Sequence, residues 1–130
     1  MKRNRRQDRF ARLRAIAEKE VAALRASLPP DVRRLALDVA TEIDREVPPL
    51  WLEDGIEPDT LGLFSGPSLR DPDASASDEA PLVSLFLGPL WDYSGHDETA
   101  FAEEVRRTYL HELGHFLGLE DPDMPERDLD

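Results

Sequence analysis

The segment Leu82–Leu87 contains only apolar residues apart from Ser84, and Gly88-Pro89 follows it directly. A run this short and this apolar is typical of a strand that is buried on both faces. Such a strand cannot stand alone in water, so the rest of the chain must supply its neighbours and its cover. This segment therefore constrains the fold more than any other part of the sequence does.

Two other segments have strand patterns. Residues 35–44 place apolar side chains at alternate positions and acidic ones between them, which predicts a strand with one buried face that stops near Pro48-Pro49. The short apolar run at 61–64 is bounded by polar and turn-forming residues and predicts a further strand. Residues 71–79 lack large apolar side chains and predict a mobile loop.

Two segments have the apolar spacing of amphipathic helices, three or four residues apart. The first covers residues 10–28 and ends at Pro29-Pro30, because proline lacks an amide donor and clashes with the preceding turn. The second begins at Asp97 or Thr99, and Gly118 is well placed to end it. Its apolar stripe consists of Phe101, Val105, Tyr109, Leu113 and Phe116.

These elements predict one α+β domain, for which 130 residues with 40% apolar content provide an adequate core. We expect the domain to span 10–124, between a basic flexible arm at 1–9 and an acidic tail at 125–130. The chain has no cysteine, which excludes disulfides and thiolate metal sites. It has no apolar run of membrane-spanning length and no pattern of a secretory signal, so we expect a cytoplasmic protein that does not enter a membrane.

Charge is distributed unevenly along the chain. Residues 1–14 carry seven basic side chains against one aspartate, a net charge of +6, whereas the whole chain carries −12, so residues 15–130 sum to −18. An acidic body of this kind repels nucleic acid, which argues against nucleic-acid binding as a function. The basic start of the chain could bind an acidic protein, RNA or the protein's own acidic surface. The alternative is that it binds nothing and is solvated.

The pattern that carries chemistry is H-E-x-x-H, at His111, Glu112 and His115. Histidines four apart on a helix project from one face, where two imidazole nitrogens can share a zinc ion at about 2.0–2.1 Å. Glu112 lies at the edge of that face and is suited to act as a general base. The two histidines fall well away from the apolar stripe of the same helix, which argues against ordinary core histidines.

A catalytic zinc ion usually has three protein ligands and a water molecule. Asp121 is the favoured third ligand, because Gly118 lets the chain leave the helix and turn back toward the histidines. Glu120, one position away, and His96, which precedes the helix, are the alternatives. A glutamate on a later helix is nearly excluded, because only nine residues follow Asp121.

The extended motif H-E-x-x-H-x-x-G-x-x-D, read from His111 to Asp121, resembles the zincin motif with aspartate in place of a third histidine. The wider chain, over roughly residues 8–124, is similar to the small bacterial zincin-like metallopeptidases sometimes called mini-zincins. The resemblance implies a compact α+β fold in which a small mixed sheet packs against an N-terminal helix and the zinc-binding helix. It also implies an edge strand that pairs with extended peptide substrates. The strand at 82–87 and the strand at 61–64 are both candidates for that edge.

Together these features predict a zinc-dependent metallopeptidase that hydrolyses peptide bonds through a zinc-bound water activated by Glu112. The expected substrates are peptides or proteins, with a preference for basic or neutral ones because the body is acidic. Two alternatives remain: a metal-binding domain without peptidase activity that serves interaction or regulation, and a chain whose motif is structural and binds no metal.

Overall fold

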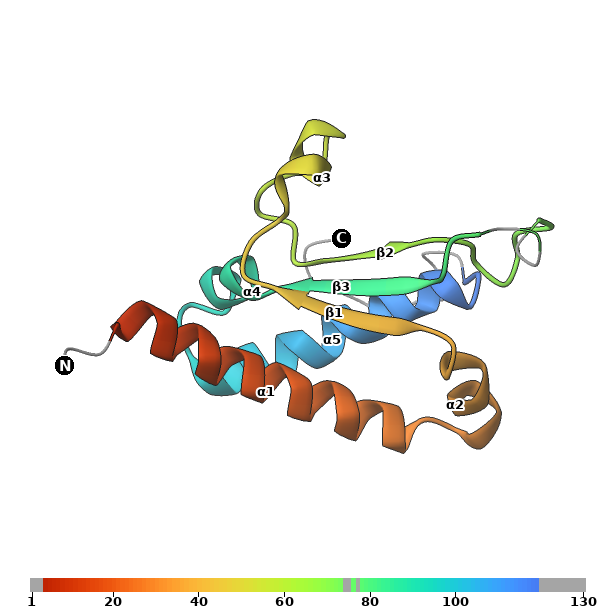
Figure 1. The fold of residues 1–130 in the computed structure, drawn as a ribbon. Coiled ribbons are helices and arrows are strands. Elements are labelled where there is room, and N and C mark those ends of the chain that lie inside the picture. The colour runs from red at the N-terminus through yellow and green to blue at the C-terminus, as the bar shows by residue number, and fades with distance from the viewer. Residues whose placement is uncertain (1–3, 74–75, 77, 120–130) are drawn as a thin grey trace.

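A computed structural model describes residues 4–73, 76 and 78–119 of the chain. Its elements, in chain order, are α1 (Arg5–Ser27), α2 (Pro30–Ala36), β1 (Ala40–Asp44), α3 (Pro49–Glu53), β2 (Gly62–Ser65), β3 (Leu82–Phe86), α4 (Leu87–Tyr93) and α5 (Glu98–Phe116). Figure 1 shows the sheet in one layer, with α1 and α5 together on one of its faces and α3 on the other. This arrangement confirms the expected α+β class.

The described strands form one mixed sheet in the order β1-β3-β2. β3 lies in the centre, parallel to β1 and antiparallel to β2. Its central position explains its continuous apolar sequence, because both of its edges and both of its faces are covered. β1 and β2 are therefore the two edges of the described sheet. Of the two strands expected as candidates for the substrate edge, the one at 82–87 is central, and only the one at 61–64, which corresponds to β2, lies at an edge.

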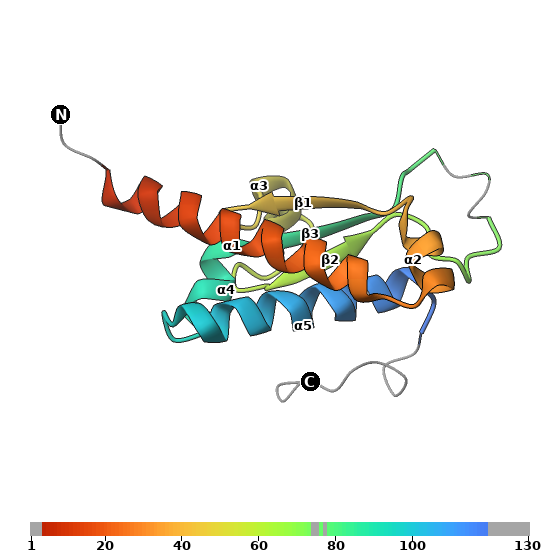
Figure 2. The same cartoon turned by 90° about the horizontal axis from the view of Figure 1, so that it is seen from below.

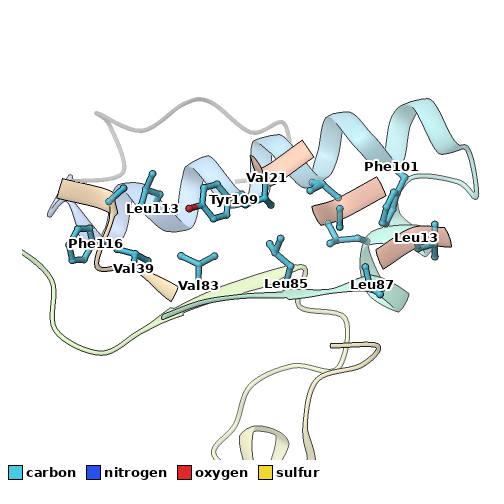
Figure 3. Packing of buried hydrophobic residues seen from close by; sticks show 14 residues of the cluster. Leu13, Val21, Val39, Val83, Leu85, Leu87, Phe101, Tyr109, Leu113 and Phe116 are labelled. Atoms are coloured by element: carbon cyan, nitrogen blue, oxygen red, sulfur yellow. The ribbon is translucent and has the colours of Figure 1, made fainter. Parts of the chain in front are cut away.

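The main core lies between the sheet and the helix pair α1 and α5, which run side by side in the same direction (Figure 2). Figure 3 shows Val83 and Leu85 of β3 directed at the apolar stripe of α5, with α1 closing the cluster. All five residues of the predicted stripe on α5 are buried. Fully burying a large apolar side chain contributes about 1.5–3 kcal/mol, so this stripe is a principal source of stability.

The sequence prediction was wrong at residues 35–39. The chain there forms α2 and a turn, and the strand begins only at Ala40. Leu35 and Leu37, expected on a buried face, are 47% and 70% exposed, while Ala36 between them is buried. The physical reason is Pro30, which fits the first turn of a helix because its missing amide needs no partner there.

Two further differences concern element boundaries. α1 begins at Arg5, with Asn4 as its N-cap accepting hydrogen bonds from the amides of Arg6 and Gln7, so residues 5–9 of the expected arm are helical. The strand expected at 82–87 ends one residue earlier, at Phe86, because Leu87 begins α4. Gly88-Pro89 lies in the first turn of that helix. Among the described residues, no helix is both long enough and apolar enough to cross a membrane.

Candidate metal centre

α5 carries the H-E-x-x-H motif in its last turns. The helix begins after Asp97, whose carboxylate accepts a hydrogen bond from the amide of Ala100 at 2.8 Å, as a good N-cap does. It ends with two hydrogen bonds that return to the helix, from the amide of Gly118 to the carbonyl of His115 and from the amide of Leu119 to the carbonyl of Gly114, both at 3.0 Å. This pattern is a Schellman motif, and it confirms Gly118 as the predicted helix stop.

His111, Glu112 and His115 come together as the spacing predicts. Each offers a ligand atom, and these atoms all lie within 4.8 Å of one another. The two imidazole rings meet nearly edge to face, with centroids 5.0 Å apart. His111 is half-buried, the side chain of His115 is 40% exposed, and Glu112 is buried. Oε1 of Glu112 lies 4.0 Å from Nε2 of His115. Two imidazole nitrogens beside a carboxylate are a donor set that zinc accepts.

A main-chain group that the sequence does not reveal contacts Glu112. The amide N–H of Phe64, in β2, donates a hydrogen bond to Oε1 of Glu112 at 3.0 Å. The ring of Phe64 packs at a tilt against Phe116, with centroids 6.0 Å apart. β2 is thus fixed to α5 directly beside the histidines. No residue-type pattern predicts this contact, because any residue at position 64 except proline would supply the same amide.

A row of buried polar residues on α5 lies under β2. Glu104, Thr108 and Glu112 are spaced four apart and are all buried. The Thr108 hydroxyl donates to Oε1 of Glu104 at 3.1 Å. Gly62 of β2 sits so close above this row that a Cβ there would lie 2.6 Å from Cγ2 of Thr108. The close approach of strand and helix therefore depends on glycine at position 62.

The comparison with known families agrees with this geometry. A family model described as zincin-like metallopeptidase matches residues 36–130, which include β1 to β3 and all of α5. The chain belongs to the zincin-like metallopeptidase family. A search of curated proteins found no similar sequence.

The family implies zinc, and His111 and His115 of this zincin-like metallopeptidase fit that metal by donor type and by spacing. The favoured third ligand, Asp121, and its alternative Glu120 lie outside the described residues. What the structure describes is the turn at Gly118, which begins the segment that leads to both.

His96, the remaining candidate ligand, is held elsewhere. Its Nε2 lies 2.8 Å from Oδ1 of Asp92, and its ring stacks on Trp91 with centroids 5.2 Å apart. It precedes the first turn of α5, roughly 20 Å along the helix from His111 at 1.5 Å per residue. This position argues against His96 as a ligand to a metal held by the two histidines.

Proposed function

We propose that this protein is a zinc-dependent peptidase in which His111, His115 and Asp121 hold the metal and Glu112 acts as the general base. The observation that carries the proposal is the meeting of both histidines with a buried carboxylate, directly beside the edge strand β2. When bound, zinc supplies a Lewis acid that polarises a carbonyl and lowers the pKa of a water molecule.

In this proposal Glu112 transfers protons and does not bind the metal. It follows the first histidine by one residue, so its side chain projects to one side of the line that joins the two imidazoles. Burial and the amide of Phe64 restrict its carboxylate to a small region next to His115. From there Glu112 would accept a proton from the attacking water and pass it to the leaving amine.

β2 is the strand best suited to bind an extended peptide. It is an edge of the sheet, it runs antiparallel to β3, and it contacts the metal-binding helix. A peptide that added to this edge would be recognised through main-chain hydrogen bonds, largely independently of its side chains. The central position of β3 argues against that strand as the substrate edge.

The surface at one end of β2 supports a preference for basic peptides. A hollow of about 520 Å³ adjoins Leu61, the residue before β2. Its lining includes three carboxylates, from Glu46, Asp59 and Asp92, together with the phenol of Tyr93. A lysine or arginine side chain of a peptide on β2 would meet negative charge there. Peptides that differ only in charge near the scissile bond test this preference, and faster cleavage of acidic peptides would contradict it.

Metal analysis and one substitution test the proposal as a whole. We expect the purified protein to bind one zinc ion, and His111→Ala or His115→Ala to lose it. Glu112→Gln should retain zinc and lose hydrolysis by roughly 10²- to 10⁴-fold, the usual contribution of a general base. Glu104→Gln is the matched control, because Glu104 is also a buried glutamate of α5 but lies two turns from the histidines.

The alternative function is metal binding without peptidase activity. The described residues form a single sheet with its covering helices and provide no second lobe to enclose a substrate over the histidines. If the zinc-loaded protein cleaves nothing in a broad peptide library, the metal-binding interaction domain becomes the better description. A protein that binds neither zinc nor any other metal would exclude both functions.

A further inference from the structure

The register determines which main-chain groups of β2 point away from β3, toward the edge that pairs with no other described strand. The amide of Phe86 donates to the carbonyl of Leu61 at 3.0 Å, so Leu61 and Phe86 form a hydrogen-bonded pair. Hydrogen-bonded and non-hydrogen-bonded pairs alternate in an antiparallel ladder. Phe64, opposite Val83, is therefore in a non-hydrogen-bonded pair, and its N–H and C=O point away from β3.

An outward amide of this kind is what an extended peptide uses when it adds to a sheet edge. In this structure the amide of Phe64 already donates to Oε1 of Glu112, at 3.0 Å. Both partners of this hydrogen bond are held in position, because Glu112 is buried and the Phe64 ring packs on Phe116. The N–H group of Phe64 therefore donates to the candidate base in this structure, and a peptide that added to β2 would require the same donor.

We propose that the Phe64 amide is a positioning group that holds Glu112 in the peptide-free protein and is transferred to a carbonyl of the bound peptide. One N–H group makes one strong hydrogen bond, so pairing of a peptide with β2 removes the hydrogen bond from the Phe64 amide to the Glu112 carboxylate. Oε1 of Glu112, no longer bound to this amide, can then accept a hydrogen bond from the water that attacks the peptide. This inference rests on the proposed function, and it links occupancy of the edge strand to the availability of the base.

The link has a chemical consequence for selectivity. A molecule too short to place a carbonyl opposite Phe64 would leave Glu112 bound to β2. An extended peptide that pairs along the edge would break this contact between Phe64 and Glu112. The protein would therefore distinguish extended peptides from small amides through its main chain, with no contribution from side-chain pockets.

Amide hydrogen exchange, measured by NMR on metal-free protein, tests whether the Phe64 amide is bound to Glu112 in the absence of peptide. The Phe64 amide should be protected in the wild type, and Glu112→Ala should speed its exchange at least tenfold. Glu112→Gln, whose side-chain carbonyl still accepts a hydrogen bond, should retain most of the protection. Amides of β3 serve as the reference for global unfolding, because they lie within the ladder. Equal Phe64 exchange in wild type and Glu112→Ala would overturn the proposal.

A peptide with a zinc-binding hydroxamate group tests whether the Phe64 amide is transferred to a carbonyl of a bound peptide. Zinc-loaded Glu112→Ala is measured with and without saturating acetyl-Leu-Leu-Gly-hydroxamate. The peptide should restore at least tenfold protection of the Phe64 amide, because its carbonyl takes the place of the missing carboxylate. No recovery would overturn the transfer. Neither measurement requires hydrolysis, so a wild type that cleaves no peptide but shows Glu112-dependent protection would contradict the peptidase and not the contact.

Discussion

Gly118 adopts a left-handed backbone conformation, with φ of 77°, immediately after the helix that carries the histidines. A Cβ at this position would lie 2.3 Å from Cγ of Arg70. The chain from here leads to Asp121, the proposed third ligand. A side chain at position 118 would therefore disturb the turn at the start of the segment that leads to this proposed ligand.

We predict that Gly118→Ala destabilises the fold by about 1–2 kcal/mol, the usual cost of a left-handed alanine, and raises the zinc dissociation constant about tenfold. Thermal unfolding and competition with a zinc chelator measure the two effects. Gly95→Ala is the matched control, because Gly95 has a similar φ of 66° and a Cβ there would meet nothing within 4 Å. An equal loss of zinc affinity in both variants would count against a ligand beyond Gly118.

For individual residues, the sequence predicted which side chains come together but could not predict the main-chain groups that contact them. His111, Glu112 and His115 could be predicted as one cluster because helical geometry brings residues three and four apart together. The Phe64 amide could not be predicted, because its position depends on strand register and on how β2 packs against α5. Asp121 stays a prediction.

The packing of β2 on α5 depends on a glycine opposite a threonine. We predict that Gly62→Ala destabilises the protein by about 1–3 kcal/mol, as overpacking does, because its Cβ would meet Cγ2 of Thr108. Thr108→Ser removes that methyl group, so the double variant should recover part of the loss, since the Cβ would still lie 3.0 Å from the carbonyl oxygen of Ser84. Urea unfolding of the wild type, both single variants and the double variant forms a complete cycle. Additive effects of the two substitutions would show that the contact between positions 62 and 108 does not limit how closely β2 packs on α5.

The docking of α1 on α5 includes an exposed ion pair between Arg12 and Glu98, with contacts of 2.5 and 2.6 Å. Hydrogen bonding to Arg12 holds the pKa of Glu98 below its ordinary value of 4.5. A lowered pKa stabilises the fold above the unfolded-state value, and this contribution disappears as pH falls through the folded-state pKa.

We therefore predict that Glu98→Gln causes a small decrease in the melting temperature at pH 7 and none at a pH well below 4.5. Scanning calorimetry across this range measures the difference between wild type and variant. Glu103→Gln is the control, since Glu103 is an exposed acid of the same helix with no ion-pair partner in the described part of the chain. A difference that grows toward low pH would contradict the assignment.

For the elements, sequence periodicity predicted the long amphipathic helices and the apolar strand, because each buries a continuous face. It misplaced the start of β1, since a helical turn led by Pro30 can imitate strand alternation over a few residues. The short helices α3 and α4 were not predicted either. Each buries too few side chains to produce a periodic signal, although the contact of Trp51 in α3 with Phe86 shows that α3 covers the second face of the sheet.

For the molecule as a whole, the candidate metal centre is separate from the main core. The buried apolar cluster joins α1, the sheet and α5, whereas the side chain of His115 is 40% exposed. We predict that chelation leaves the far-UV circular dichroism nearly unchanged and lowers the melting temperature. Binding of zinc at a free concentration of about 100 times its Kd would add about 2.7 kcal/mol. A His111→Ala variant should lose the zinc-dependent shift, and unfolding on chelation would show that the metal is structural.

The strand order β1-β3-β2 also has a consequence for synthesis of the protein. Both edge strands leave the ribosome before the central strand that pairs with them, and β1 and β2 do not pair with each other. The nascent chain therefore holds two unpaired strands until Phe86 has emerged, and the candidate metal ligands follow later still. Pairings between distant segments are slow to form, so this interval is when the chain is most open to misassembly or to capture by a chaperone.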